Sequence, residues 1–165
     1  MVRIRTIFAA ALALVAAPAM GQEQSAAPLD SPTYTDPLPA EPKAMVAAFL
    51  RDHTAWNAFA RDNYDRTKDV TEAEVAYRRL IDLYCGPAKS HQGITFGTDP
   101  SYDAERSEIL EEREEDDRRI VNVRHTNDFD FVAVHDFVFV HRDGRWWLEE
   151  VYYYDDYGEE WLPSL

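Results

Sequence analysis

Cysteine is nearly absent from this chain of 165 residues, and Cys85 is the single example. An internal disulfide is therefore excluded. A lone cysteine is either a buried thiol or the site of an intermolecular bond. Because Cys85 stands at the end of an apolar helical stretch, we expect a buried thiol.

The sequence also lacks the short motifs of common enzyme chemistry. It contains no nucleophile elbow, no phosphate-binding loop and no dinucleotide fingerprint. None of its five histidines form an H-x-x-x-H pair, and zinc needs three or four converging ligands. His125, His135 and His141 lie on adjacent predicted strands and are the only set that could gather around a metal or an active site. We therefore expect no metal and no cofactor.

Basic side chains are scarce relative to acidic ones. Lys and Arg number 17 against 31 Asp and Glu, so the formal net charge is −14. Such a charge repels nucleic acid and anionic membrane surfaces, and it speeds encounter with a cationic partner. Solubility alone would explain the same composition, so charge does not choose the function.

Long hydrophobic runs are missing except at the start of the chain. Arg3 and Arg5 precede an apolar run over residues 7–17, and Pro18 breaks it. This order is typical of a secretory signal peptide, and the run is too short to span a bilayer. We predict a signal peptide over residues 1–21, cleaved near Ala19 or Gly21, and a periplasmic or secreted protein with no membrane insertion after cleavage.

A proline-rich segment follows at residues 22–42, with prolines at 28, 32, 37, 39 and 42. Proline removes backbone donors, and the segment has few large apolar side chains to bury. It is predicted to be a disordered tether. The rest, residues 43–165, has the size of one domain.

Two helices are predicted at the start of this domain. Apolar residues recur at helical spacing over residues 43–64, beginning with Met45 and Phe49. The second helix begins at Thr71, where Thr71 and Glu74 form the pattern of a capping box. Gly86 and Pro87 end it, because glycine permits a left-handed exit and proline cannot continue a helix.

The second half has the period of strands. Strands are predicted at residues 93–97 and 118–126. Residues 107–113 fit a strand or a helix almost equally. Residues 131–141 are apolar on both faces, which indicates a central strand. An Asp-Gly turn follows at residues 142–145. In the last strand, residues 146–155, the apolar pattern slips at Glu149-Glu150, which indicates a β-bulge. The chain is therefore predicted to be α+β.

A family resemblance rests on several of these residues. They are Trp56 in the first helix, YRRLIDLYC (77–85) in the second, DGRW (143–146) before the last strand, and an end that runs YYD (153–155), Gly158 and WLPSL (161–165). With these features the chain resembles the NTF2-like superfamily, and most of all its NTF2-fold immunity proteins. The resemblance implies an NTF2-like (cystatin-like) cone, with two or three N-terminal helices packed on a strongly curved antiparallel β-sheet.

The resemblance also implies a function. An exported immunity protein would be a non-catalytic binding protein that neutralises a cationic toxin by direct binding, and it could form a homodimer through the sheet. The alternative is an exported NTF2-like enzyme of isomerase or dehydratase type, or a small-ligand binder that uses the cone cavity. A structural domain of an envelope assembly is a third reading.

The strongest catalytic candidate is His135, followed directly by Asp136. Neighbours in a strand point to opposite faces, so only one of the two enters a cavity. His135 shares its face with aromatic residues, which could depress its pKa and make it a base near neutral pH. Tyr152 or Tyr154 on the adjoining strand could donate to a developing oxyanion. A pair that merely satisfies its hydrogen bonds across strands remains open.

Acidic residues gather twice, at residues 111–117 and around residues 155–160. We expect the first cluster to mark a turn between strands, solvated as charge runs usually are. The second is interleaved with aromatic residues, a combination that suits an interface with a basic protein. The predicted partner-binding residues are Tyr153, Asp155, Asp156, Tyr157 and Trp161.

Overall fold

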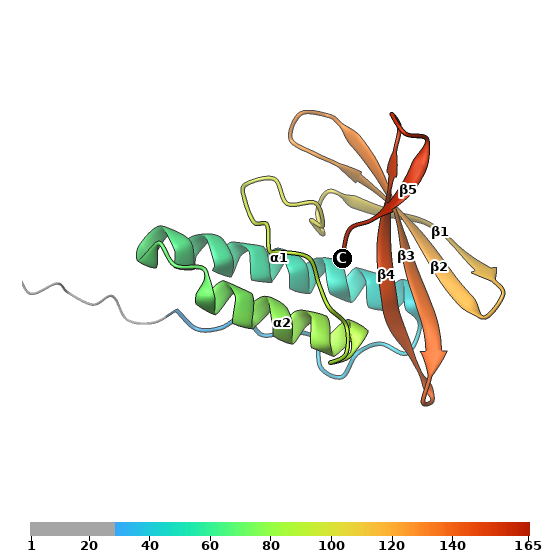
Figure 1. Ribbon diagram of the computed structural model, residues 1–165, viewed down its shortest axis with the longest axis horizontal. Helices are drawn as coiled ribbons and strands as arrows, with labels where there is room; N and C mark the ends of the chain where they lie inside the picture. The colour runs from blue at the N-terminus through green and yellow to red at the C-terminus, as the bar shows by residue number, and fades with distance from the viewer. Residues whose placement is uncertain (1–28) are drawn as a thin grey trace, which may run out of the picture.

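The computed structural model describes residues 29–165, and the predicted signal peptide and residues 22–28 lie outside this range. The α+β prediction is confirmed, because two helices pack on one antiparallel sheet of five strands in the order β1-β2-β3-β4-β5 (Figure 1). The elements are α1 (Pro42–Thr67), α2 (Thr71–Cys85), β1 (Ser107–Glu115), β2 (Arg118–Thr126), β3 (Val132–Arg142), β4 (Arg145–Asp155) and β5 (Glu160–Pro163). No helix within residues 29–165 is long and apolar enough to cross a membrane.

The core lies between the helices and one face of the sheet. Trp56 of α1 is fully buried, and its indole nitrogen donates to the Ala73 carbonyl of α2 at 2.9 Å. Helix α1 contacts β1 and β2, and α2 contacts β4. Phe49 bridges the layers, since its ring meets those of Tyr84 and Phe137. The apolar stripes predicted for the two helices thus face each other and the sheet.

The second helix begins without the predicted capping box. Thr71 is already inside the helix, and the preceding Val70 offers no side-chain acceptor. Instead the carboxylate of Asp69 accepts hydrogen bonds from the Thr71 backbone N–H at 3.0 Å and from its hydroxyl at 2.8 Å. The pattern Thr71-x-x-Glu74 predicted the start of the helix correctly, but the side chain that accepts hydrogen bonds there is Asp69 rather than Thr71.

The prediction of a strand at residues 93–97 is wrong, because this segment belongs to an irregular loop between α2 and β1. The reason lies in α1. The Asn57 side chain accepts from the Gly97 N–H at 3.0 Å and donates to the Gly97 carbonyl at 2.8 Å. A side chain therefore satisfies the backbone groups that a neighbouring strand would otherwise bind.

Residues 107–113, which fitted strand or helix, belong to β1. The acidic run does not lie wholly in a turn as predicted, because β1 continues to Glu115. Arg119 of β2 reaches Glu112 at 3.3 Å and Glu114 at 3.2 Å. Cross-strand ion pairs thus hold part of the run in the sheet, and only Asp116 and Asp117 remain for the turn.

Strand β3 is central, as predicted. It is the third of five strands, and six successive side chains from His135 to Val140 are buried. The Asp143-Gly144 turn is also confirmed, since both residues have positive φ, 53° and 79°. Glu150 pairs with Val138 and Leu148 with Phe139, which leaves Glu149 as the extra residue of the predicted bulge. Strand β5 was not predicted.

Disorder in the proline-rich segment is contradicted for residues 29–41. The Tyr34 hydroxyl donates to the Ala76 carbonyl at 2.8 Å, and the Thr35 N–H donates to Asp52 at 2.8 Å. Leu29, Tyr34 and Leu38 pack against the core. Asp52 is buried in α1 and also accepts from the Tyr84 hydroxyl at 2.7 Å. The domain therefore begins before residue 43, because a buried carboxylate in α1 binds the segment's backbone.

Candidate functional site

A cavity of about 500 Å³ opens between α1, the loop after α2 and the sheet. Its position follows from the topology, since the β2–β3 loop and the β4–β5 hairpin stand at the same end of the sheet (Figure 1). Aromatic and histidine rings make up much of the wall. Its side chains include His53, Trp56, Tyr77, Tyr102, His125, Phe131, His135 and Tyr153. Drug-sized ligands occupy cavities of this volume.

Tyr102, from the loop after α2, connects the sides of this cavity. Its ring meets His53 at 5.0 Å and His135 at 5.4 Å, measured between ring centroids. Burial raises the pKa of its hydroxyl to about 12. The hydroxyl oxygen lies 2.7 Å from the Ser164 hydroxyl oxygen, so the loop and the C-terminal segment are joined at the cavity wall.

His53 stands on α1 and is 4 % exposed. Its Nδ1 has no hydrogen-bond partner among the described residues. Burial lowers the pKa of its imidazole to about 4, although a hydrogen bond to the Tyr102 backbone opposes this. The imidazole is therefore neutral at physiological pH. An unpaired polar atom in such a place costs about 1–3 kcal/mol of stability, which calls for an explanation.

His135, the predicted catalytic candidate, lines the cavity from β3 and is 5 % exposed. Within residues 29–165 its imidazole forms no hydrogen bond. Burial, with a smaller contribution from the neighbouring His125, lowers its pKa to about 4. His125 is also buried, and its Nδ1 lies 3.3 Å from the Ser107 hydroxyl oxygen. A base with this pKa is a neutral hydrogen-bonding group near pH 7 and a weak proton acceptor.

The other histidine of the predicted set is elsewhere. His141 does not line this cavity, and its ring contacts Trp146 at 5.0 Å near the β3–β4 turn. His53 takes its place beside His125 and His135. No group of three or more potential metal-binding side chains occurs in the described part of the chain.

The tyrosine expected to assist His135 lies on the opposite face. Tyr152 pairs with Asp136, whereas Tyr153 pairs with His135 and lines the cavity. Strand alternation decides this, because paired residues share a face. Asp136 itself is satisfied away from the cavity. It accepts from the Arg113 guanidinium at 2.5 Å and from the Asn122 amide at 2.7 Å.

The predicted partner-binding residues gather in the β4–β5 hairpin. Tyr154 and Trp161 pair across it with ring centroids 5.3 Å apart, and Tyr157 at the tip is 102 % exposed. Asp155 has a structural role, since its carboxylate accepts the N–H groups of Tyr157 and Gly158, both at 3.2 Å. Asp156 is exposed. Tyr153 belongs to the cavity wall as well as to this surface.

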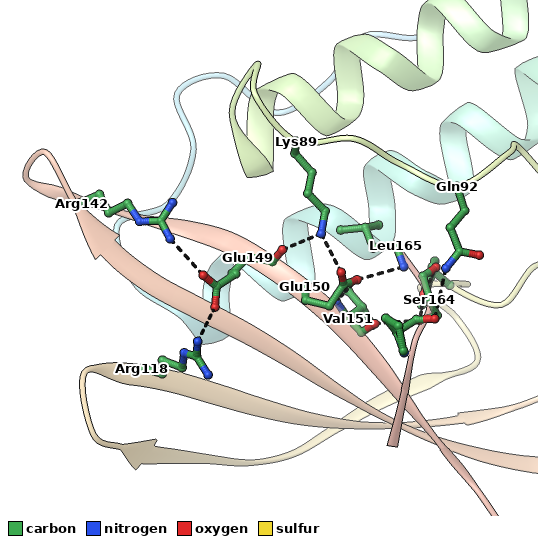
Figure 2. A network of polar contacts seen from close by, with 11 residues as sticks. Lys89, Gln92, Arg118, Arg142, Glu149, Glu150, Val151, Ser164 and Leu165 are labelled. Atoms are coloured by element: carbon green, nitrogen blue, oxygen red, sulfur yellow. Dashed lines mark hydrogen bonds and ion pairs between the residues drawn. The ribbon is translucent and has the colours of Figure 1, made fainter. Parts of the chain in front are cut away.

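A polar network ties together three segments of the cavity wall (Figure 2). The bulge places Glu150 where one carboxylate oxygen accepts from Lys89 at 2.7 Å and the other from the Leu165 N–H at 3.1 Å. Gln92, from the same loop as Lys89, donates to the Pro163 carbonyl at 3.2 Å. The loop after α2, strand β4 and the C-terminal segment are thus held in one arrangement.

Cys85 lies outside the cavity wall and is half-buried, packed against the core. Burial raises the pKa of its thiol to about 12. The expectation of a shielded thiol holds in part, and a thiol with this pKa is a poor nucleophile.

Three residues of the site, His53, Tyr102 and Ser164, were absent from the sequence interpretation. A signal existed for His53, which follows Phe49 by four residues and precedes Trp56 by three, on the apolar face of α1. Tyr102 and Ser164 carry no comparable signal, because they come from irregular segments that pack on each other through tertiary contacts.

No family model matches the chain, and neither a curated protein nor a solved structure does.

Proposed function

We propose that this protein binds a small organic molecule in the cavity, and that its domain is a cone of the NTF2-like type. The two helices, the bulged antiparallel sheet and the cavity at the end of the sheet support that fold. Of the functions considered, this corresponds to the exported small-ligand binder. Export rests on the N-terminal sequence alone.

The observation that carries this proposal is the set of buried histidines. His53 and His135 are both nearly inaccessible, and the Nδ1 of His53 is buried without a hydrogen-bond partner within residues 29–165. A core needs no such groups, since buried polar atoms without partners destabilise the fold. A ligand that forms hydrogen bonds with them would explain why the cavity wall contains them.

The test is a variant that fills the cavity. Ala133 lines it from β3 and is not itself one of the core residues, so Ala133→Phe would occupy cavity volume without removing a core side chain. We expect Ala133→Phe to abolish binding of small aromatic molecules, measured by ligand-observed NMR. Tyr157→Ser, on the exposed hairpin tip, is the matched control and should bind as the wild type. Equal binding by both variants would overturn the proposal.

A second candidate is an interface for a cationic protein, as expected for an immunity protein. The observation that favours it is the exposed apolar surface around the cavity end of the sheet. Phe129 is 76 % exposed and Phe131 72 %, and the acidic hairpin with Tyr157 stands at the same end. Exposed aromatic side chains among carboxylates suit a basic partner.

A further inference from the structure

We propose that the cavity selects an uncharged ring-containing molecule that carries an O–H or N–H donor. The donor would bind the imidazole nitrogen of His135, and the ring would lie among Trp56, Tyr77 and Tyr102. This inference rests on the proposed ligand-binding function and names the chemical class of the ligand.

The requirement that the ligand contain a ring follows from the aromatic side chains of the cavity wall. Trp56 and Tyr77 pack with ring centroids 4.5 Å apart, and Tyr102 meets His53 and His135 edge to face. All of these side chains line the same cavity. Aromatic rings pack on one another in offset or edge-to-face geometry and gain about 0.5–1.5 kcal/mol per pair beyond burial. A flat ligand ring can extend this arrangement, whereas a flexible chain cannot.

The requirement that the ligand carry a hydrogen-bond donor follows from the neutral state of the buried histidines. A neutral imidazole has one N–H and one lone pair, so each of the three buried histidines presents one acceptor. His125 has the Ser107 hydroxyl beside one nitrogen, the Nδ1 of His53 lacks a partner within residues 29–165, and His135 lines the same cavity. A ligand with acceptors alone would leave the imidazole lone pairs unsatisfied.

The requirement that the ligand be uncharged follows from the ionised side chains around the cavity. Asp99 is the one charged side chain on the described wall, and Arg106 already pairs with it at 3.0 Å. An anion would find no cationic side chain to offset its desolvation, and a cation would have to compete with Arg106. Burial of an unpaired charge is far more costly than burial of a neutral donor that finds an acceptor.

Four simple probes separate these elements: phenol, anisole, benzoate and cyclohexanol. Phenol has the ring and the donor, anisole lacks the donor, benzoate adds a negative charge, and cyclohexanol lacks the aromatic ring. Binding to the purified protein is measured by NMR, following the histidine ring nitrogens and the Trp56 indole. We expect phenol to bind at least about tenfold more tightly than anisole, as the loss of one buried hydrogen bond predicts. Phenol should also bind more tightly than benzoate, which would bury an unpaired charge, and than cyclohexanol, which lacks the aromatic ring.

Two variants assign the donor site. His135→Phe keeps a ring of similar size and removes the acceptor, so phenol should bind no more tightly than anisole. His141→Phe is the control, since His141 lies outside the cavity, and it should leave the phenol affinity within about twofold of wild type. If His135→Phe does not fold, the ratio of phenol to anisole affinity in the wild type still tests whether the ligand needs a donor.

The outcomes distinguish this inference from the proposed function. If anisole or benzoate binds as tightly as phenol, the ligand class is wrong while the cavity remains a binding site. If cyclohexanol matches phenol, the requirement for an aromatic ring is wrong. If none of the four binds, the proposed ligand-binding function fails together with this inference.

Discussion

At the scale of single residues, two of the three buried histidines, His53 and His135, dominate the acid–base behaviour of this protein. His53 and His135 belong to different elements, and burial lowers the pKa of each to about 4. In the unfolded chain both would titrate near the ordinary value of about 6.5. The unfolded state therefore binds more protons between these two values, and the folded state loses stability as the pH falls through this window.

We accordingly predict that acidification destabilises the protein before its ordinary carboxyl groups titrate. Between about pH 7 and about pH 5, each of the two histidines should cost about 2 kcal/mol of unfolding free energy. Urea unfolding at the two pH values measures the loss. His53→Phe and His135→Phe should each remove one histidine's share, and equal stability of the wild type at both pH values would contradict the lowered pKa values.

At the scale of elements, the bulge in β4 determines which partners the neighbouring Glu149 and Glu150 contact. Glu149 projects toward Arg118 and Arg142, at 3.1 Å and 2.9 Å, and both arginines are largely exposed. Glu150 instead forms an ion pair with Lys89 whose two side chains are 15 % and 20 % exposed, and it also binds backbone N–H groups (Figure 2). Removing the extra residue would shift this part of the strand by one residue and turn Glu150 to the other face of the sheet.

This contrast gives a matched pair of substitutions. We predict that Glu150→Ala lowers the free energy of unfolding by about 3 kcal/mol, because it leaves the Lys89 ammonium shielded and unpaired. Glu149→Ala removes exposed ion pairs and should cost less than about 1 kcal/mol. Chemical denaturation compares the two. Equal losses would show that the Glu150 network does not hold the loop after α2 to the C-terminal segment.

The segment over residues 29–41 is the other element whose role depends on one side chain. Its prolines favour an extended chain, as the sequence suggested, but the Asp52 carboxylate binds its backbone and hydroxyl groups. Proline-rich composition therefore describes the conformation of a segment without deciding whether it docks on the domain.

At the scale of the whole molecule, acidic residues and exposed aromatic rings meet at one end of the sheet. The β4–β5 hairpin, with Asp156 and Tyr157, stands at the same end of the sheet as the β2–β3 loop (Figure 1), and Phe131 and Tyr153 at this end line the cavity. The β1–β2 turn, with Asp117, stands at the opposite end in this antiparallel order. For the second candidate function, we therefore expect a cationic protein to bind at this aromatic end.

For the second candidate function we predict that position, rather than net charge, controls partner capture. Asp156→Lys should weaken capture of a cationic partner from envelope and culture fractions about tenfold at low salt, with less effect at high salt. Asp117→Lys makes the same charge change at the far end and should capture normally. Asp155 is unsuitable for this test, since its carboxylate holds the turn. Equal loss in both variants would reject a specific hairpin interface.

Much of the fold could be predicted from the sequence because its signals are local. The helix period over residues 43–64, the alternation over residues 118–126, the Asp-Gly turn and the slip at Glu149 each depend on residues a few positions apart. Predictions failed where a distant side chain replaced the local rule, as Asn57 does for residues 93–97 and Asp52 for residues 29–41.

The sequence by itself determined the α+β class, the central strand with His135, and the strongly acidic character of the chain. Only the tertiary structure decided the site. In it, His53 of α1 and His135 of β3 line one cavity. Tyr153 rather than Tyr152 lies on the cavity face, and His141 lies near the β3–β4 turn at the other end of the sheet. The physical reason is that a site joins segments far apart in the chain, and their meeting depends on register, bulges and loop packing that no local pattern contains.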